Sequence, residues 1–449
     1  MNSVIRLGRG SIVVERPTEQ MKKILKRFRH DTGEYEDLFS LSSNGQVLAT
    51  MPGFASRLQG LGLVIDGRMR MPEPDLESMA KGMSTAWSDV VAKAVKAGGG
   101  IIEIPGDIWV CDVVEAILRA YPRNRLLDRG TPMCVVAAEN SKSCRALAAG
   151  IQKMVPRREV GIISGNRMTD VEDVVVATYR NIRDIRMDTV GLFIGTGITP
   201  GFATFDRVGN ISGIRNAARF GILETSMYIA QDIAVEGLFG PTVAAMTHAE
   251  AIRLGEAMPV TVCWLPCRRP NTNLGSADPR LLEALSLQEN PAVVDMVARI
   301  ATETPDELGC LVLAESNAMA KRVKAKAADL LTIIHGGDIY ARRNKFDGMK
   351  EVVAGNARKA LLVSAVPESA EHRVAVAASC HTAELRWFPW RKKNGADKAY
   401  IVDFLHDWDV HNGRPGYLAR NDEARKMLYR QMGFSQMTVG KVDELPFIG

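Results

Sequence analysis

The pattern of apolar and polar residues changes along the chain. Residues 1–80 contain short apolar runs, SIVVE, QVLAT and LGLVID, separated by Gly, Pro and Asn, which is typical of strands joined by turns. From about residue 81, helical patterns alternate with nearly continuous apolar runs, among them GIIEIP, MCVVAA, EVGIIS, DVVVATY and VGLFIG. Such alternation predicts a parallel sheet covered by helices on both faces.

A second series of the same kind starts near residue 300. Its predicted strands are LGCLVLAES, LLTIIHGG, KALLVSAV, HRVAVAAS and KAYIVDFL, and the polar stretch PCRRPNTNLGSADPR before it is typical of a linker. We therefore expect an α/β protein with a small N-terminal accessory domain at 1–80, a first lobe at 81–268, a linker at 269–300 and a second lobe at 301–449.

Composition places the chain among globular proteins. Apolar residues make up 46% and charged residues 24% of the 449 residues, and no apolar run is long enough to cross a bilayer. The N-terminal MNSVIRLGRG lacks the layout of a signal peptide, so we expect a cytoplasmic protein without a membrane partner. Seven scattered cysteines fit reduced thiols better than disulfides, and the spacing of Cys263 and Cys267 does not indicate a zinc site.

The net charge of +5 is small, but cations gather in two segments. MKKILKRFRH, residues 21–30, predicts a short basic helix, and ELRWFPWRKK, residues 384–393, places cations beside three aromatic rings. Nucleic-acid bases stack on exposed aromatic rings while neighbouring cations hold the phosphates. The alternatives are a solvated surface for both segments and, for the tryptophans, burial between lobes.

The order of these segments resembles that of superfamily 2 helicases, especially the DEAD/DEAH-type helicases of bacteriophages. The resemblance covers about residues 83–435, where GGGIIEIP resembles the strand before the nucleotide loop, MCVVAAENSKSCRALAAGIQKM the first nucleic-acid motif and VGLFIGTG the acidic strand. In the second lobe, LGCLVLAES, TIIHGG, KALLVSAV and KAYIVDFLHDWDVHNGRPGYLAR follow in the family's order. The resemblance implies two RecA-like parallel-sheet lobes in tandem.

The nucleotide loop departs from the family at every position. The family's Thr-Gly-Ser-Gly-Lys-Thr corresponds here to Gly106, Asp107, Ile108, Trp109, Val110 and Cys111. In such a loop, backbone amides and a lysine bind the phosphates, and a hydroxyl holds magnesium. Val110 and Cys111 stand in place of the lysine and the hydroxyl, Ile108 and Trp109 are bulky, and Asp107 repels an anion.

Other catalytic positions of the family are altered as well. In VGLFIGTG, Thr196 and Gly197 replace the Asp and Glu that order magnesium and position the attacking water. LET, residues 223–225, replaces the coupling motif Ser-Ala-Thr, and Trp87 stands at the adenine-reading glutamine. The arginine-rich strand aligns with Glu384, Trp387, Phe388 and Arg391 and keeps only Arg391, unless a shift of two residues brings Arg386 to the place of Phe388.

These losses predict degenerate ATPase motifs and a pseudoenzyme. Removing one charge-stabilising group costs about 10²–10³ in rate, and an arginine finger is worth about 10³–10⁵. Several such groups are missing together, so we expect neither ATP nor magnesium as a cofactor. The strand GIIEIP then remains because the folding core needs it.

The favoured hypothesis is a catalytically degenerate helicase-like scaffold that binds nucleic acid, a partner protein or both, in phage DNA metabolism or assembly. We expect DNA rather than RNA, and as partner an active helicase paralogue or a replication or recombination protein. The candidate nucleic-acid contacts are Thr178, Arg180, Arg183, Arg386, Trp387, Trp390, Arg391, Lys392 and Lys393.

Two alternatives from the enzyme class remain open. One is an active ATP-dependent helicase or translocase with unusual residues at its ATP site. The other is a metal-dependent hydrolase built on His406, Asp407, Asp409 and His411, although a polar loop after a strand explains these residues more simply. A dinucleotide fingerprint in GTGITPG is disfavoured, because its spacing is GxGxxxG and a proline interrupts the start of the helix.

Overall fold

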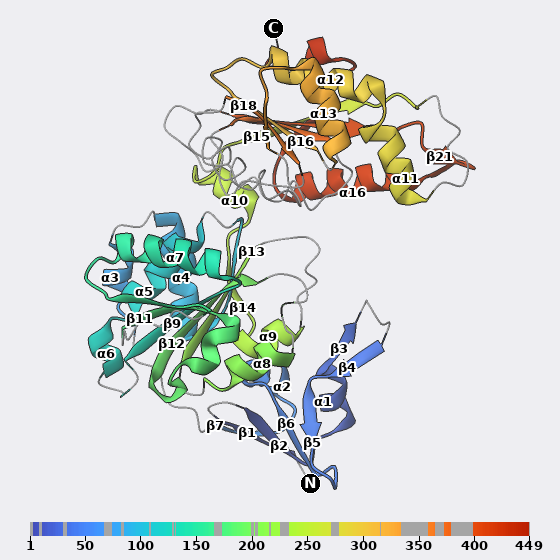
Figure 1. Ribbon diagram of the computed structural model, residues 1–449. Coiled ribbons are helices and arrows are strands. Elements are labelled where there is room, and N and C mark those ends of the chain that lie inside the picture. The colour runs from blue at the N-terminus through green and yellow to red at the C-terminus, as the bar shows by residue number, and fades with distance from the viewer. Residues whose placement is uncertain are drawn as a thin grey trace. The chain divides into compact units, whose positions relative to one another are not determined.

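The computed structural model divides the chain into two compact units, Met1–Met246 and Thr247–Gly449, which we describe separately (Figure 1). The residues that the structure describes are 3–8, 11–29, 34–66, 74–81, 85–106, 109–127, 130, 132–165, 173–198, 202, 205–214, 217–224, 233–270, 278–314, 316–333, 358–363, 372–378 and 398–448.

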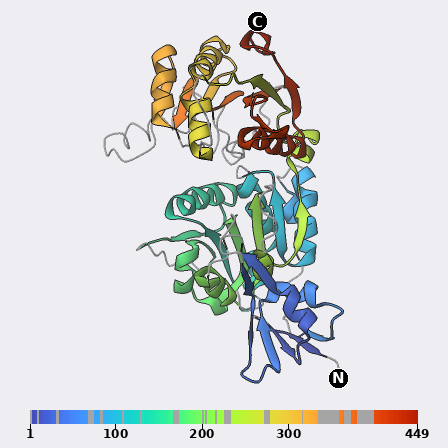
Figure 2. The ribbon, with the colours of Figure 1, turned by 90° about the vertical axis from the view of Figure 1, so that its right-hand side faces the viewer.

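The first unit begins with a small mixed sheet of five strands in the order β5-β6-β2-β1-β7 (Figures 1 and 2). The strands are β1 (Val4–Leu7), β2 (Ile12–Glu15), β5 (Phe39–Leu41), β6 (Val47–Thr50) and β7 (Leu63–Asp66). The predicted strands SIVVE, QVLAT and LGLVID are thus confirmed as β2, β6 and β7. Alternating apolar residues of this sheet, Ile5, Val14 and Leu48, are buried in one core with the first lobe.

The prediction of one basic helix over 21–30 is wrong. Helix α1 (Glu19–Ile24) ends early, and β3 (Lys26–Arg29) then pairs antiparallel with β4 (Glu34–Asp37). The acidic residues of β4 attract the cations of β3, and Lys26 Nζ lies 3.2 Å from Asp37 Oδ1. This hairpin therefore neutralises much of the charge that indicated a nucleic-acid contact.

The first lobe contains seven parallel strands in the order β10-β11-β9-β12-β13-β8-β14. They are β8 (Gly100–Ile104), β9 (Met133–Ala138), β10 (Val160–Ile163), β11 (Val174–Thr178), β12 (Val190–Ile198), β13 (Ala218–Glu224) and β14 (Thr242–Ala245). The helices are α3 (Leu76–Ala80), α4 (Thr85–Ala97), α5 (Val110–Ala120), α6 (Arg123–Leu127), α7 (Ser141–Met154), α8 (Phe205–Ser212) and α9 (Ile233–Phe239). Figure 1 shows α4, α5 and α7 on one face of this sheet and α8 and α9 on the other.

The second lobe repeats this architecture in the order β17-β18-β16-β19-β20-β15-β23, again with all strands parallel. The strands are β15 (Val260–Pro266), β16 (Cys310–Ala314), β17 (Leu331–Ile333), β18 (Lys359–Val363), β19 (Val374–Ala378), β20 (Ala399–Leu405) and β23 (Ser435–Thr438). Its elements also include α10 (His248–Arg253), α11 (Pro279–Glu283), α12 (Pro291–Glu303), α13 (Asn317–Lys326), α16 (Tyr417–Gln431) and the hairpin of β21 (Val410–His411) and β22 (Arg414–Pro415).

Both sheets have one and the same topology. If the strands of each sheet are numbered in chain order, both orders read 3-4-2-5-6-1-7. The predicted fold, an α/β protein with two RecA-like lobes in tandem and a small N-terminal domain, is confirmed.

The residues expected to end the first lobe and to form a linker belong to the second unit instead. Strand β15, expected in the first lobe, pairs with β20 and β23 of the second sheet. Much of the expected linker 269–300 is helical, and α12 buries Val293, Val297 and Ile300 in the second core. Asn290 and Pro291 lie within the expected linker range, and they are the N-cap and the first residue of α12.

The division between the two units falls at the peptide bond between Met246 and Thr247. Met246 still belongs to the first unit, because its buried backbone N–H donates to Glu103 O of β8 at 2.9 Å. Thr247 begins the second unit as the N-cap of α10, where its hydroxyl accepts from Glu250 N and the Glu250 carboxylate accepts from Thr247 N.

Candidate functional site

Residues assigned to the nucleotide site, and Thr178 from the nucleic-acid contacts, follow strands of the first sheet. Gly106 and Trp109 follow β8, Thr178 ends β11, and Thr196 and Gly197 lie near the end of β12. In a parallel sheet the carboxyl ends of all strands meet at one edge, where α/β proteins bind their ligands. The structure therefore brings the predicted positions to the edge at which a nucleotide would bind.

The loop after β8 keeps the strand-loop-helix frame of a phosphate loop. The backbone N–H of Trp109 donates to Gly106 O at 3.2 Å, and α5 begins at the next residue, Val110. Helix α5 buries an apolar face, Val113, Val114 and Ile117, which explains why this frame is retained. Asp107 and Ile108 lie outside the described residues.

Two tryptophans fill the space beside this loop. Trp109 is 0% exposed and Trp87 of α4 is 2% exposed. Their ring centroids lie 6.0 Å apart, with 37° between the ring planes, so the two indoles pack on each other. Cys111 faces α7, where a Cβ placed on Gly150 would lie 3.0 Å from its Sγ. The side chains of Trp109 and Cys111 are therefore both packed against the protein interior.

The end of β12 uses its polar groups within the protein. The Thr196 hydroxyl donates to Ala137 O of β9 at 2.9 Å, and the hydroxyl of the buried Tyr179 donates to Thr196 O at 2.7 Å. Burial raises the pKa of Tyr179 far above its usual range, which keeps this hydroxyl protonated as a donor. Gly197 adopts φ +64°, a conformation that favours glycine.

Glu139 is a carboxylate at this edge that the sequence analysis missed. It directly follows β9, and a Cβ placed on Gly197 would lie 3.5 Å from the Glu139 Cβ. Its side chain is exposed. The signal that identifies it is positional: an acidic residue that directly follows a buried parallel strand lies at the ligand-binding edge.

The predicted nucleic-acid contacts after β11 divide into one buried and two exposed side chains. Thr178 is buried, and its hydroxyl donates to Asn181 Oδ1 at 2.6 Å. Arg180 and Arg183 lie on the short helix Tyr179–Asp184 and are exposed. The nearest carboxylate recorded for Arg183 is that of Asp184, at 3.9 Å. The hydroxyl of Thr178 thus orders this turn, whereas the two guanidinium groups are available to solvent.

The other predicted contacts fall outside the described residues. They are Arg386, Trp387, Trp390, Arg391, Lys392 and Lys393, together with the aligned Glu384 and Phe388.

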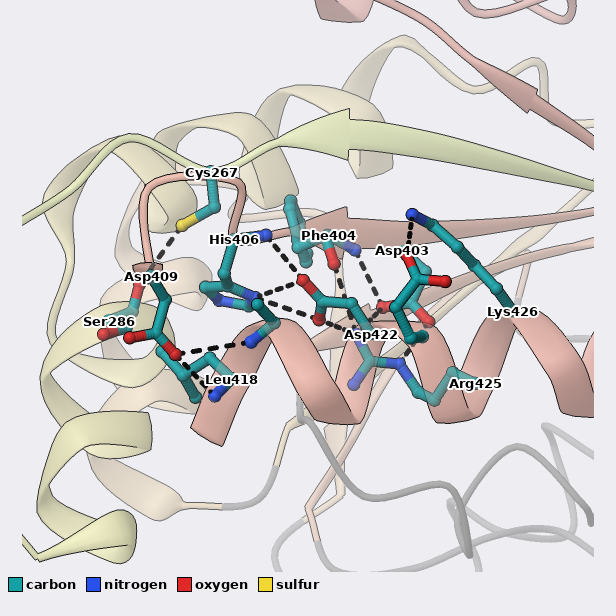
Figure 3. Close-up of polar contacts among 12 residues, drawn as sticks. Cys267, Ser286, Asp403, Phe404, His406, Asp409, Leu418, Asp422, Arg425 and Lys426 are labelled. Atoms are coloured by element: carbon teal, nitrogen blue, oxygen red, sulfur yellow. Dashed lines mark hydrogen bonds and ion pairs between the residues drawn. The ribbon is translucent and has the colours of Figure 1, made fainter. Parts of the chain in front are cut away.

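The second lobe contains a buried ionic cluster between β20 and α16 (Figure 3). Arg425 donates from Nε to Asp403 Oδ2 at 2.8 Å and from Nη2 to Asp422 Oδ1 at 2.9 Å, and all three side chains are buried. Tyr429 donates its hydroxyl to Asp403 Oδ2 at 3.0 Å. Burial raises the pKa of Asp403, and the Arg425 charge opposes that rise.

His406, Asp409 and His411, considered as metal ligands, have other partners in the structure. His406 Nδ1 lies 3.1 Å from Asp422 Oδ1, and Asp409 accepts from the backbone N–H of Leu418 at 2.7 Å, where it caps α16. The exposed His411 contacts Asp409 through Nε2 at 3.0 Å. In the part of the chain that the structure describes, no group of three potential ligands is arranged to hold a metal ion.

No protein-family model and no curated protein sequence matches the chain, but solved structures do. Yeast (S. cerevisiae) Dbp5 bound to RNA and ADP BeF3 superimposes with a TM-score of 0.50 and 9% identity over 81% of this chain and 96% of that chain. The DUF1998 helicase MrfA bound to DNA gives 0.52 and 9% over 83% of this chain and 54% of that chain. T4 UvsW gives 0.42 and 12% over 98% and 100%.

At these identities the similarity establishes a fold. The chain shares its two-lobed fold with Dbp5 and the helicase MrfA, as the first two superpositions show. Within the described residues, no helix is both long enough and apolar enough to cross a membrane.

Proposed function

We propose that this protein is a catalytically degenerate, superfamily 2 helicase-like scaffold that binds nucleic acid, a protein partner or both without using ATP. The proposal combines a fold shared with helicases and a loop after β8 whose bulky side chains are packed within the protein. DNA as the nucleic acid, a helicase paralogue or a replication or recombination protein as the partner, and a phage setting follow from the family resemblance alone.

The packing of Trp109 against Trp87 carries the proposal. By resemblance, Trp109 stands in the phosphate loop and Trp87 at the position that reads adenine. The two rings pack on each other and are almost completely buried, which supports the proposal that they fill volume that a bound nucleotide would need. A protein interior is close-packed, and two indoles cannot yield such volume without a substantial rearrangement.

The magnesium side of the site supports the same proposal. Thr196 stands at an acidic position of the family, and its hydroxyl already donates to Ala137 O. Val110 and Cys111 offer neither a cation for the phosphates nor a hydroxyl for the metal. Without the lysine and the magnesium ion, nothing at these positions would neutralise the negative charge of a triphosphate.

A titration with a fluorescent ATP analogue in the presence of Mg²⁺ tests the loss of nucleotide binding. We expect no saturable signal up to about millimolar analogue. A dissociation constant above that concentration corresponds to less than about 4 kcal/mol of binding free energy. Saturable, magnesium-dependent binding in the micromolar range would contradict the proposal. An active superfamily 2 helicase titrated in parallel verifies that the analogue reports binding.

Nucleic-acid binding is proposed for the exposed Arg180 and Arg183 and for the cationic, aromatic segment 386–393. Anisotropy of a labelled single-stranded DNA measures binding, and the logarithm of the affinity should fall linearly with the logarithm of salt concentration. Substituting Arg180 and Arg183 with Ala should lower that slope by about one to two. Arg6→Ala, which removes an exposed cation of the N-terminal sheet, is the control and should leave the slope unchanged. A flat salt response of the wild type would favour a scaffold for proteins alone.

One observation favours an active ATP-dependent translocase as a second candidate. Glu139 places a carboxylate beside Gly197, near the position from which the family's acidic residues act. DNA-stimulated ATP hydrolysis that disappears in Glu139→Gln would establish this alternative. We expect no such activity, because none of the described loop residues carries the positive charge that the family's lysine supplies.

A further inference from the structure

The short 3₁₀-helix Tyr179–Asp184 presents two arginines on one exposed edge. Three residues complete a turn of such a helix, so residues three apart lie on the same edge. Tyr179 and Ile182 form the edge that is buried in the first lobe. Arg180 and Arg183 form an edge that is exposed to solvent. Two guanidinium groups on one edge can contact neighbouring phosphates of the same nucleic-acid strand.

Asn181 lies on the third edge of this helix, where both atoms of its amide make contacts. Its Oδ1 accepts from the Thr178 hydroxyl at 2.6 Å and from the backbone N–H of Gly165 at 3.3 Å. Its Nδ2 donates to Asp184 Oδ2 at 3.0 Å and lies 3.5 Å from Gly165 O. These contacts use both donors and both lone pairs of the amide. Because Gly165 follows β10, Asn181 also joins the loop after this strand to the helix that carries the arginines.

The hydrogen bond from Asn181 keeps the Asp184 carboxylate away from Arg183. Asp184 Oδ2 accepts from Asn181, whereas Asp184 Oδ1 lies 3.9 Å from Arg183 Nε. A hydrogen bond between a guanidinium and a carboxylate is about 2.7–2.9 Å long, so this pair is loose. The side chains of Arg183 and Asp184 are 65% and 40% exposed, which leaves both room to rotate into a closer pair. Asn181 opposes that rotation, and Arg183 keeps its donors for another anion.

We propose, on the basis of the nucleic-acid function proposed above, that Asn181 is a positioning residue for the DNA contact. It holds Asp184, so that Arg180 and Arg183 bind neighbouring phosphates of one strand. Without Asn181, the Asp184 carboxylate would turn to Arg183 and compete with a phosphate for the same donors. Because phosphates carry no sequence information, binding through this edge is independent of base sequence.

A double-mutant cycle, measured by anisotropy of a labelled single-stranded DNA at low salt, tests the proposal. Asn181→Ala should weaken binding about twofold to fivefold, the range expected for an exposed ion pair that competes with the phosphate. Asp184→Asn should bind at least as tightly as the wild type, because it removes the competing charge. In the Asp184→Asn background, Asn181→Ala should have no further effect, since no carboxylate remains to be held.

Asn44→Ala is the matched control, because Asn44 also orders a turn through its amide. Its Oδ1 accepts from the Ser42 hydroxyl at 2.7 Å and from Gln46 N at 3.1 Å, in the turn between β5 and β6. Its loss should leave the affinity for DNA unchanged. Thermal unfolding of each variant is compared with that of the wild type, and Asn181→Ser takes the place of Asn181→Ala if the latter does not fold.

The other outcomes reject the proposal, and they separate it from the proposed function. A wild type that binds no single-stranded DNA rejects the nucleic-acid function and the role of Asn181 together. A wild type that binds, with Asn181→Ala equally tight, rejects the role of Asn181 alone. An equal loss in the presence and in the absence of the Asp184 charge also rejects it, because Asn181 would then act through the loop at Gly165. A loss in Asn44→Ala as large as that in Asn181→Ala rejects it as well, since any loosened turn would then weaken binding.

Discussion

Arg57 and Glu236 form a bidentate ion pair between the N-terminal domain and the first lobe. Arg57, on α2 (Ala55–Leu58), donates to the Glu236 carboxylate of α9 from Nε at 2.8 Å and from Nη2 at 2.5 Å. The Glu236 side chain is only 8% exposed, and that of Arg57 34%. Because a buried carboxylate requires a partner, this pair fixes how the domain docks on the lobe.

Arg57→Ala should destabilise the first unit by about 1–3 kcal/mol. The change leaves the carboxylate of Glu236 buried without its partner, and the partial exposure of Arg57 keeps the loss below that of a fully buried pair. Urea denaturation measures the difference. Arg6→Ala is the matched control, because the Arg6–Glu15 pair is exposed on both sides and should cost less than about 1 kcal/mol. Equal losses in the two variants would contradict a structural role of the Arg57 pair.

Gly53→Ala should be more damaging than its size suggests. A Cβ on Gly53 would lie 2.1 Å from Glu236 O and 2.6 Å from Gly237 O, and both atoms belong to the backbone of α9. Backbone atoms cannot move aside as a flexible side chain can, so we expect a loss of about 3 kcal/mol or more, measured as a lowered Tm. Gly209→Ala, at a position with open space, should be neutral or slightly stabilising. A Gly53→Ala protein as stable as the wild type would show that the domain docks differently.

Arg425→Met should destabilise α16 by about 3–5 kcal/mol at neutral pH, because it leaves two buried carboxylates without their cation. The effect should shrink as the pH falls. Burial already raises the pKa of Asp403, and removing Arg425 raises it further. In the folded variant, a fall in pH therefore protonates the Asp403 carboxylate, which then no longer needs a cation beside it. Amide hydrogen exchange in α16, compared at pH 7 and pH 5 after correction for intrinsic rates, measures the change. A destabilisation that is independent of pH would contradict it.

The buried thiols should be unreactive in the native protein. Burial raises the pKa values of Cys144 and Cys263 to about 11 and those of Cys267 and Cys310 to about 12. Only thiolates react rapidly with iodoacetamide, so mass spectrometry should find these four residues unlabelled at pH 8 and labelled in urea. Rapid labelling of native Cys310 would refute their burial.

The same thiols predict a loss of stability in alkali. Unfolded thiols ionise above about pH 9, whereas the folded ones keep their protons. Their contribution to the free energy of unfolding is therefore complete below that pH and is lost as the pH rises through about 11–12. Urea midpoints at pH 8 and pH 10 measure the fall.

The two-lobed architecture was predictable because buried parallel strands are nearly continuous apolar runs. The apolar runs VGLFIG and MCVVAA predicted two strands, and they form the central strands β12 and β9. The boundary between the lobes was not predictable in this way. The linker was predicted from the polar stretch 266–280, and its end was set at residue 300 although the apolar residues of α12 already belong to the second core.

The sequence placed the candidate loop after a buried strand, but it did not predict the contacts of the loop. The sequence located the loop after β8, but the packing of Trp109 on Trp87 joins residues that are far apart in the chain and depends on tertiary structure. Glu139 escaped notice because it belongs to no motif and is significant only through its neighbour Gly197 in space. The basic segment 21–30 was misread because the acidic partners of its cations lie on the next strand.

The backbone that connects the two units at Met246 and Thr247 is very short. A hydrogen bond to β8 holds the residue on one side, and a capping box holds the residue on the other. A glycine pair inserted between these two residues would therefore lengthen the connection and leave the hydrogen bonds of both cores intact.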